Sequence, residues 1–181
     1  MNSFSISWFA AISPGVSLAG IPLGLSEAEF ESELAMYAID DKRTLYRFEG
    51  SPVLKMARSE GGVGERGYIF DLFESDIVSL NKRGIPALTI QLRQGEVFAI
   101  KIYDFSFPGE PANDFVYKGL LHSNIGLGSV VAELMPYTSL EFDRGEGWFV
   151  TDESFGLVEV SGWGVPLEEE PQQVITAICV L

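Results

Sequence analysis

The chain has 181 residues, of which 46% are hydrophobic and 12% aromatic, and its formal net charge is −14. This length fits one domain or two small fused units, and the apolar content excludes disorder as the default state. No stretch approaches ~18 uninterrupted apolar residues, so we expect no membrane span. Because an acidic chain repels phosphates, we also expect no nucleic-acid partner.

The N-terminal segment has no basic region, and its apolar run is too short and interrupted for a secretory signal. The single cysteine, Cys179, excludes a disulfide within the chain and suits a reducing compartment. We therefore expect a cytoplasmic protein in which Cys179 is a small core residue.

A short helix is predicted after the segment Ile21-Pro22-Leu23-Gly24. Ser26 is the expected N-cap and Glu29 occupies position N3, so the two residues predict a capping box. Phe30 and Leu34 then lie on one face of the helix, which we expect to be buried.

Runs rich in β-branched and aromatic residues follow this helix and predict strands. Gln94-Gly95 is typical of a tight hairpin turn between the last two runs. The segment 59–65 is rich in glycine and reads as a loop. The predicted strands span 44–49, 53–58, 68–73, 87–93 and 97–105.

A weak internal repeat divides the chain. Ile125-Gly126-Leu127-Gly128 repeats the I-x-L-G pattern of residues 21–24, and both copies have a glutamate five residues after the final glycine of the pattern. The second predicted helix starts near Ser129 and stops at Pro136. Further strands are expected at 139–142, 147–151, 156–161 and 174–180, with a turn at 144–147.

These elements predict an α+β fold with mixed or antiparallel sheets and a few short helices. The first α+β unit spans 1–106 and the second, acidic α+β unit spans 113–181. A connector at 107–112, rich in proline and glycine and stiffened by its prolines, joins them. The two weakly related units either stand apart or form one compact domain.

The charge is concentrated in the second unit. From Ser106 to the end there are twelve acids and two bases, Lys118 and Arg144, a local balance of 2 − 12 = −10. The first 105 residues are nearly balanced. A one-signed field attracts cationic partners and speeds their encounter, so the sequence predicts a basic protein partner.

The sequence lacks the residues of common catalytic sites. His122 is the only histidine, which excludes any site that needs two. There is no Walker, GxSxG, HExxH or EF-hand pattern, and paired carboxylates arise by composition in so acidic a chain. We expect no catalytic, cofactor-binding or metal-binding residue, and no enzymatic activity.

The candidate partner-binding residues are acids and one tryptophan of the second unit. Trp163 precedes three consecutive glutamates in the loop 162–172, and an aromatic anchor beside a charged rim is typical of binding hot spots. The alternative interpretation is a solvated loop tip. Trp148 is predicted to be core. The predicted interface comprises Trp163, Glu168, Glu169, Glu170, Asp143, Glu146, Asp152 and Glu153.

Four segments together carry a family resemblance: Pro14-Gly15-Val16-Ser17, residues 20–24, residues 124–129 and Leu140-Glu141-Phe142-Asp143. In these the chain resembles bacterial immunity proteins of polymorphic toxin systems, which accompany toxins delivered by contact-dependent inhibition, Rhs or type VI secretion systems. The resemblance implies a small α+β protein that binds and blocks one cognate toxin domain. It carries over no interface residue.

Because the chain is acidic, we expect this toxin to be basic. Because the chain is expected in the cytoplasm, we expect the toxin to act there. Two other hypotheses remain. One is a small-ligand-binding protein or an enzyme of unknown class, and the other is a nucleic-acid mimic or general interaction module.

Overall fold

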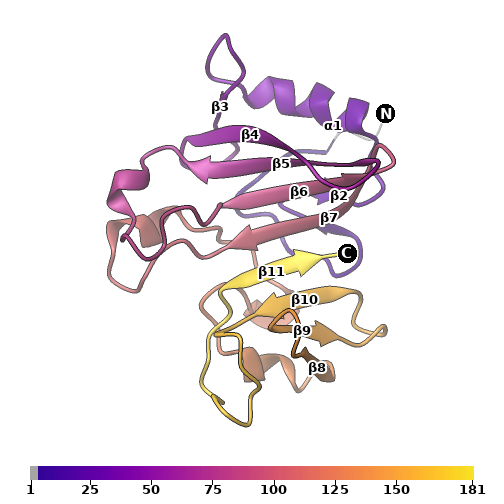
Figure 1. The fold of residues 1–181 in the computed structure, drawn as a ribbon, viewed down its shortest axis with the longest axis vertical. Helices are drawn as coiled ribbons and strands as arrows, with labels where there is room; N and C mark the ends of the chain where they lie inside the picture. Colours follow the sequence, from indigo (N-terminus) through magenta and orange to yellow (C-terminus); the bar gives the residue numbers. More distant parts are fainter. Residues whose placement is uncertain (1–3) are drawn as a thin grey trace.

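The computed structural model describes residues 4–181, so the first three residues of the predicted first unit lie outside it. Nine strands form one antiparallel sheet in the order β3-β4-β5-β6-β7-β11-β10-β9-β8 (Figure 1). In the described part of the chain, a two-stranded antiparallel sheet (β1-β2), one α-helix and short 3-10 helices accompany it. The predicted α+β fold is confirmed, and the sheets are antiparallel.

The observed elements follow the predicted strand runs closely. The first half contains β1 Ser17–Leu18, β2 Ile21–Pro22, α1 Glu27–Leu34, η1 Ala35–Tyr37, β3 Leu45–Tyr46, β4 Leu54–Glu60, β5 Glu65–Leu72, η2 Ser75–Ile77, β6 Leu88–Arg93 and β7 Glu96–Tyr103. The second half contains η3 Pro111–Phe115, η4 His122–Asn124, η5 Val131–Leu134, β8 Leu140–Asp143, β9 Trp148–Thr151, β10 Val158–Ser161 and β11 Ala177–Val180.

Helix α1 begins at the predicted cap. The Ser26 hydroxyl accepts the Glu29 N–H at 3.3 Å, and the Glu29 carboxylate accepts the Ser26 N–H at 3.2 Å. Phe30 and Leu34 are buried, and the Phe30 ring meets the edge of Tyr68 with 5.0 Å between ring centroids. Burial of this apolar face, more than the propensity of eight residues, stabilises so short a helix.

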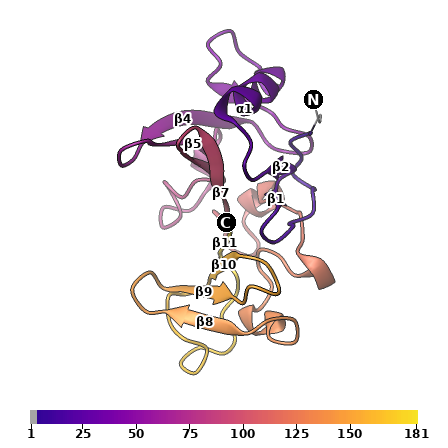
Figure 2. The ribbon, with the colours of Figure 1, turned by 90° about the vertical axis from the view of Figure 1, so that its right-hand side faces the viewer.

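One face of the sheet carries the core, and the other face is open. Strand residues alternate between the two faces, and Phe70, Ile90, Ile100 and Val160 are fully buried on the core face. In Figure 2, β1, β2 and the segment that follows β7 all lie on the same side of the sheet. The open face therefore presents the other half of the strand side chains, from β3 at one end of the sheet to β8 at the other.

The internal repeat is visible in the main-chain hydrogen bonds. In the first half, the segment before α1 is tied to the start of β7 by three bonds: Gly24 N to Val97 O, Val97 N to Leu25 O and Glu27 N to Gly95 O, each 2.8–2.9 Å. The second half has the corresponding three, Gly128 N to Ile175 O, Ile175 N to Ser129 O and Val131 N to Gln173 O, at 2.8–3.0 Å.

The two sets correspond residue by residue, since 128 − 24 and 131 − 27 both equal 104, while 175 − 97 and 173 − 95 both equal 78. The last strands of the two halves, β7 and β11, pair antiparallel with Lys101 opposite Cys179. These two residues also correspond, because 179 − 101 equals 78. A pseudo-two-fold axis therefore passes through this pair and relates the two halves of the sheet.

Two local predictions were wrong. The second helix is only the four-residue 3-10 helix η5, and His122, which the sequence places in a predicted strand rather than at a catalytic site, lies in the 3-10 helix η4. The first error has a physical reason. The residue that corresponds to Ser26 is Val130, which has no oxygen to cap the first turn, and Pro136 follows closely.

Candidate protein-binding surface

The open face of the second half gathers acids around a tryptophan. Glu141 on β8 pairs with Val150 on β9, which pairs with Glu159 on β10. Asp143 pairs with Trp148 in the same way. Because paired residues share a face, these side chains all lie opposite the buried Phe149. We call Glu141, Asp143, Glu146, Trp148 and Glu159 the acidic face.

The tryptophan of this face is half-buried. The Nζ of Lys101 lies 5.2 Å from the centroid of the Trp148 ring, a cation–π contact that reaches from β7 towards β9. A hollow of about 240 Å³ lies among Lys101, Trp148 and the acids Asp143, Glu146 and Glu159. The prediction that Trp148 is core was wrong, because its side chain lies on the uncovered side of the sheet.

Cys179 lies at the centre of the open face yet is fully buried. Burial raises the pKa of its thiol to about 12, because the thiolate would lose its hydration. The thiol therefore stays protonated and unreactive at neutral pH, which agrees with the predicted small core residue.

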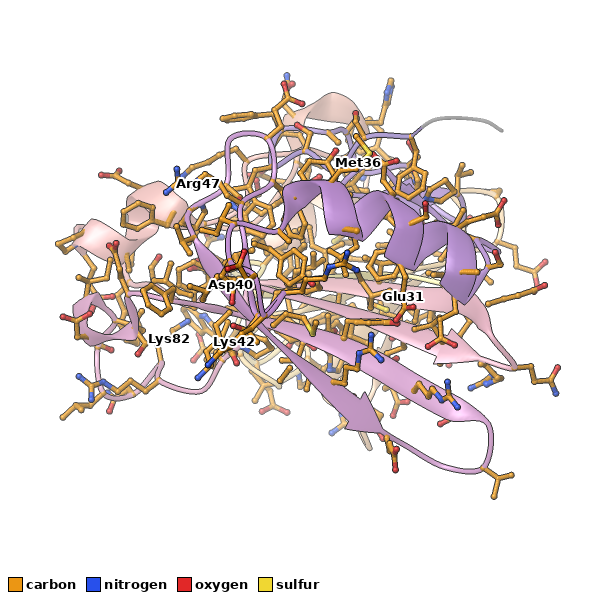
Figure 3. All side chains as sticks on the ribbon, turned by 90° about the horizontal axis from the view of Figure 1, so that it is seen from above. Glu31, Met36, Asp40, Lys42, Arg47 and Lys82 are labelled. Carbon is orange, nitrogen blue, oxygen red and sulfur yellow. The ribbon has the colours of Figure 1, made fainter. Side chains whose placement is uncertain are left out.

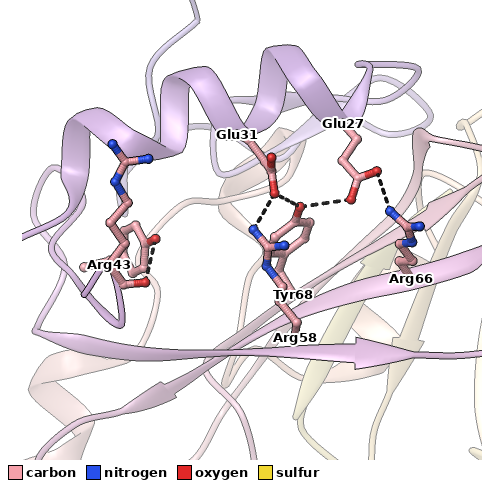
Figure 4. A network of polar contacts seen from close by, with 7 residues as sticks. Glu27, Glu31, Arg43, Arg58, Arg66 and Tyr68 are labelled. Carbon is pink, nitrogen blue, oxygen red and sulfur yellow. Dashed lines mark hydrogen bonds and ion pairs between the residues drawn. The ribbon is translucent and has the colours of Figure 1, made fainter. Parts of the chain in front are cut away.

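Ion pairs are confined to the first half among the residues that the structure describes. Three are formed there, Arg58–Glu31 at 2.6 Å, Arg66–Glu27 at 3.3 Å and Arg93–Glu65 at 3.1 Å. Figure 4 shows the first two, which meet at the hydroxyl of Tyr68. Within residues 4–181, no acid after Ser106 forms an ion pair, so the local charge of −10 is uncompensated.

The carboxylate of Asp152 accepts hydrogen bonds from neighbouring parts of the chain. Its two oxygens accept hydrogen bonds from Ser154, Ser139, Thr138 and the Phe155 N–H, at 2.5–3.2 Å. The Ser154 hydroxyl and then the Ser139 N–H contribute most to lowering the pKa of this carboxyl. Asp152 therefore closes the β9–β10 turn, at the end of β9 away from Trp148.

The loop 162–172 is held by one buried side chain. Gln173 is fully buried, accepts the Trp163 N–H at 2.9 Å and donates to the carbonyls of Val165 and Glu170 at 2.9 and 3.0 Å. The Trp163 side chain is 54% exposed. A Cβ on Gly147 would lie 3.3 Å from the Cα of Gly164, so this loop touches the β8–β9 turn.

The structure thus brings together two of the predicted interface residues, Asp143 and Glu146, and places the loop that carries Trp163 against the adjoining β8–β9 turn. The three consecutive glutamates are exposed, and Glu168 lines a groove beside η5, away from the acidic face. Asp152 and the exposed Glu153 lie at the opposite end of β9.

Sequence reasoning missed Glu141, Trp148, Glu159 and Lys101. A signal for the first two was present, since the alternation in Leu140-Glu141-Phe142-Asp143 and in residues 148–151 puts these side chains on one face. No local signal marks which face of a sheet stays uncovered. That depends on where the N-terminal segment and the segment after β7 pack.

A second hollow bears on the ligand-binding alternative. It has a volume of about 570 Å³ and lies beside residues 73–85, with Lys55, Lys82 and Arg83 in its lining. Asp71 is the one acid there, and burial raises its pKa while Lys55 lowers it. The hollow does not bring two carboxylates together, so the pair needed for acid–base chemistry is not assembled at this place.

Comparison with family models and with curated proteins found no match. Among solved structures, the chain is similar to a cysteine-rich secretory protein from Staphylococcus aureus subsp. aureus Mu50, with 8% identity and a TM-score of 0.35. The similarity covers 97% of this chain and 50% of the other, so the chain spans about half of that protein's length. Separately, no helix within residues 4–181 is long and apolar enough to cross a membrane.

Proposed function

We propose that this protein is an immunity protein that binds a cognate basic toxin domain in the cytoplasm and neutralises it through the acidic face. One observation carries the proposal: four acids without ion-pair partners surround a half-buried tryptophan on an uncovered sheet face. Such a face offers both a charge to a basic partner and an aromatic anchor.

The two ingredients contribute to different steps of binding. The acids steer a basic partner and raise the rate of association, whereas a buried aromatic anchor slows dissociation. Trp148 and the nearby exposed Trp163 are the candidate anchors. The Lys101 cation beside Trp148 gives the face a fixed pattern of charge, which favours one register of docking.

The proposal predicts that a toxin domain is encoded next to this chain's gene, and that domain is the partner to be tested. Co-expression of the wild-type chain should restore the growth of cells that produce the toxin domain. Glu141→Lys combined with Glu159→Lys should lose this protection. Glu60→Lys combined with Glu74→Lys makes the same change of charge on exposed acids of the first half and should retain it.

Binding kinetics at different salt concentrations tests whether electrostatic attraction speeds the association. Raising the salt concentration to ~0.5 M should lower the association rate much more than it raises the dissociation rate, because screening acts mainly on the encounter. An association rate that is insensitive to salt, or equal protection by both double variants, would refute binding through the acidic face.

A further inference from the structure

Strand β8 is an open edge of the sheet. In the described part of the chain it pairs only with β9, on one side. The corresponding outer strand of the first half, β4, carries β3 on its outer side at Leu54 and Lys55. Every second residue of an edge strand directs its N–H and C=O away from the sheet, so β8 offers unbonded main-chain groups to a further strand.

The two sides of this edge differ in chemistry. On the open face, the exposed Glu141 and Asp143 border the edge. On the core side, Leu140 and Phe142 are only partly buried, and Leu140 lines an apolar groove of about 680 Å³ with Met135 and Leu167. A strand laid along β8 would therefore have acids beside one set of its alternate side chains and apolar atoms beside the other.

This difference between the two sides of β8 determines which kind of strand can pair with it. A second copy of β8 is unfavourable, because pairing of two such edges would bring glutamates and aspartates of both chains together. A strand with lysine or arginine at alternate positions and apolar residues between them matches both sides. Edge charges also protect sheets against aggregation, and that simpler role predicts that no added strand binds.

We propose that the β8 edge binds an extended strand of the partner in which basic and apolar residues alternate, by addition to the sheet. The identity of that partner as a toxin rests on the proposed function, whereas the chemistry of the edge does not. The added strand would lie beside the acidic face, so that a domain bound there could contribute both the strand and the surface that meets Trp148.

A peptide probe on the full-length protein tests the mode of binding. The probe is a synthetic acetylated peptide of alternating lysine and valine, and amide hydrogen exchange at residues 140–143 is the measurement. We expect the peptide to slow exchange at the outward-facing amides of β8 by about tenfold or more at saturation. An alternating glutamate–valine peptide should have no effect.

Methylated peptides distinguish strand addition from simple attraction of charge. Only one set of alternate peptide N–H groups points towards β8. One peptide is methylated on the main-chain nitrogens of its lysines and another on the main-chain nitrogens of its valines. We expect one of the two methylations to abolish the protection of β8 and the other to leave it unchanged. Equal binding by both, or binding without protection of β8, would overturn the proposal.

Matched variants locate the site. Glu141→Lys should weaken peptide binding several-fold more than Glu60→Lys, which makes the same charge change on the outer strand of the first half. If the peptide protects β8 but the toxin domain is not neutralised, the proposed function fails and the edge site stands. If the toxin domain is neutralised without protection of β8, the edge site fails and the function stands.

Discussion

The two halves of the sheet share a scaffold and differ in what they do with their charges. In the first half, Glu27 and Glu31 of helix α1 pair with arginines of β4 and β5 and accept hydrogen bonds from Tyr68, whose pKa is raised first by burial and then by Glu31. Figure 3 shows acids and bases interspersed there, with Glu31 and Asp40 on the same half as Lys42, Arg47 and Lys82. In the second half, no acid has such a partner within residues 4–181.

This difference separates stability from binding. A pseudo-two-fold scaffold gives both halves the same main-chain ties, so ion pairs are not needed to hold the second half in place. Exposed ion pairs contribute little to stability in any case. The second half can therefore leave its acids without intramolecular partners, and those acids remain available to a cation from outside.

The largest expected effect tests whether the halves fold as one unit. Phe30 and Leu134 correspond, since 134 − 30 equals 104, and both are fully buried. Phe30→Ala should lower the free energy of unfolding by about 3–5 kcal/mol and Leu134→Ala by about 2–5 kcal/mol. Because β7 and β11 join the halves, we expect a single thermal transition in both variants. Two separate transitions in the Leu134 variant would show that the halves unfold independently.

A corresponding pair of aspartates should respond oppositely to substitution. Ile69 and Val150 occupy equivalent places in the two halves of the sheet, and two residues further on stand Asp71 and Asp152. Burial raises the pKa of Asp71, whereas hydrogen bonds led by that of Ser154 lower the pKa of Asp152. At pH 7, Asp152→Asn should therefore lower the melting temperature, and Asp71→Asn should raise it.

The sign follows from linkage. The depressed pKa of Asp152 stabilises the fold above the ordinary aspartate pKa of ~3.9, and this contribution is lost as pH falls towards the folded-state value. The raised pKa of Asp71 costs stability once pH exceeds ~3.9. Both differences from wild type should shrink below about pH 4, and melting curves between pH 3 and pH 7 measure them. Differences that persist unchanged at low pH would point to packing.

The helix caps give a smaller effect. Ser26→Ala should lower the free energy of unfolding by about 1 kcal/mol through loss of the capping box. Urea unfolding, with Ser17→Ala as the control serine substitution in the short strand β1, measures this change. A midpoint equal to that of the wild type would show that the cap contributes nothing.

The second half offers the reverse substitution. Val130 has the extended backbone of an N-cap residue, and Glu133 lies three residues later, where Glu29 lies after Ser26. Val130→Ser would complete a second capping box and should raise stability by up to about 1 kcal/mol, less whatever the lost valine methyls contribute. Urea unfolding of this variant and of Val130→Ala separates the gain from the new cap from the loss of the valine methyl groups. If the serine variant is no more stable than the alanine variant, η5 cannot use a cap.

Local features were predictable from the sequence, and the joining of the halves was not. The Ser26–Glu29 box and the Gln94-Gly95 turn, where both residues have positive φ, depend on neighbouring residues alone. The pairing of Lys101 with Cys179 joins residues 78 positions apart, and no short pattern specifies it. The acidic bias after Ser106 indicated the half in which the binding surface is proposed, but the choice of Trp148 depends on which sheet face stays uncovered.

The smallest effect on stability is expected from the loop 162–172. Replacing Glu168, Glu169 and Glu170 together by lysine should leave the melting temperature nearly unchanged, because the three side chains are exposed and Gln173 holds the loop through main-chain groups. Relief of self-repulsion in a chain of net charge −14 works in the same direction.

The same triple variant also tests whether the partner binds the acidic face or is only attracted by the net charge of the chain. It changes the charge by six units, yet Glu168 lies beside η5 and not on the acidic face. If long-range attraction alone governs binding, it should slow association with a basic domain more than Glu141→Lys with Glu159→Lys, which changes the charge by four. If contact with the acidic face governs binding, the double variant should also speed dissociation, whereas the triple variant should not. Stopped-flow association and dissociation rates of the two variants decide between these outcomes.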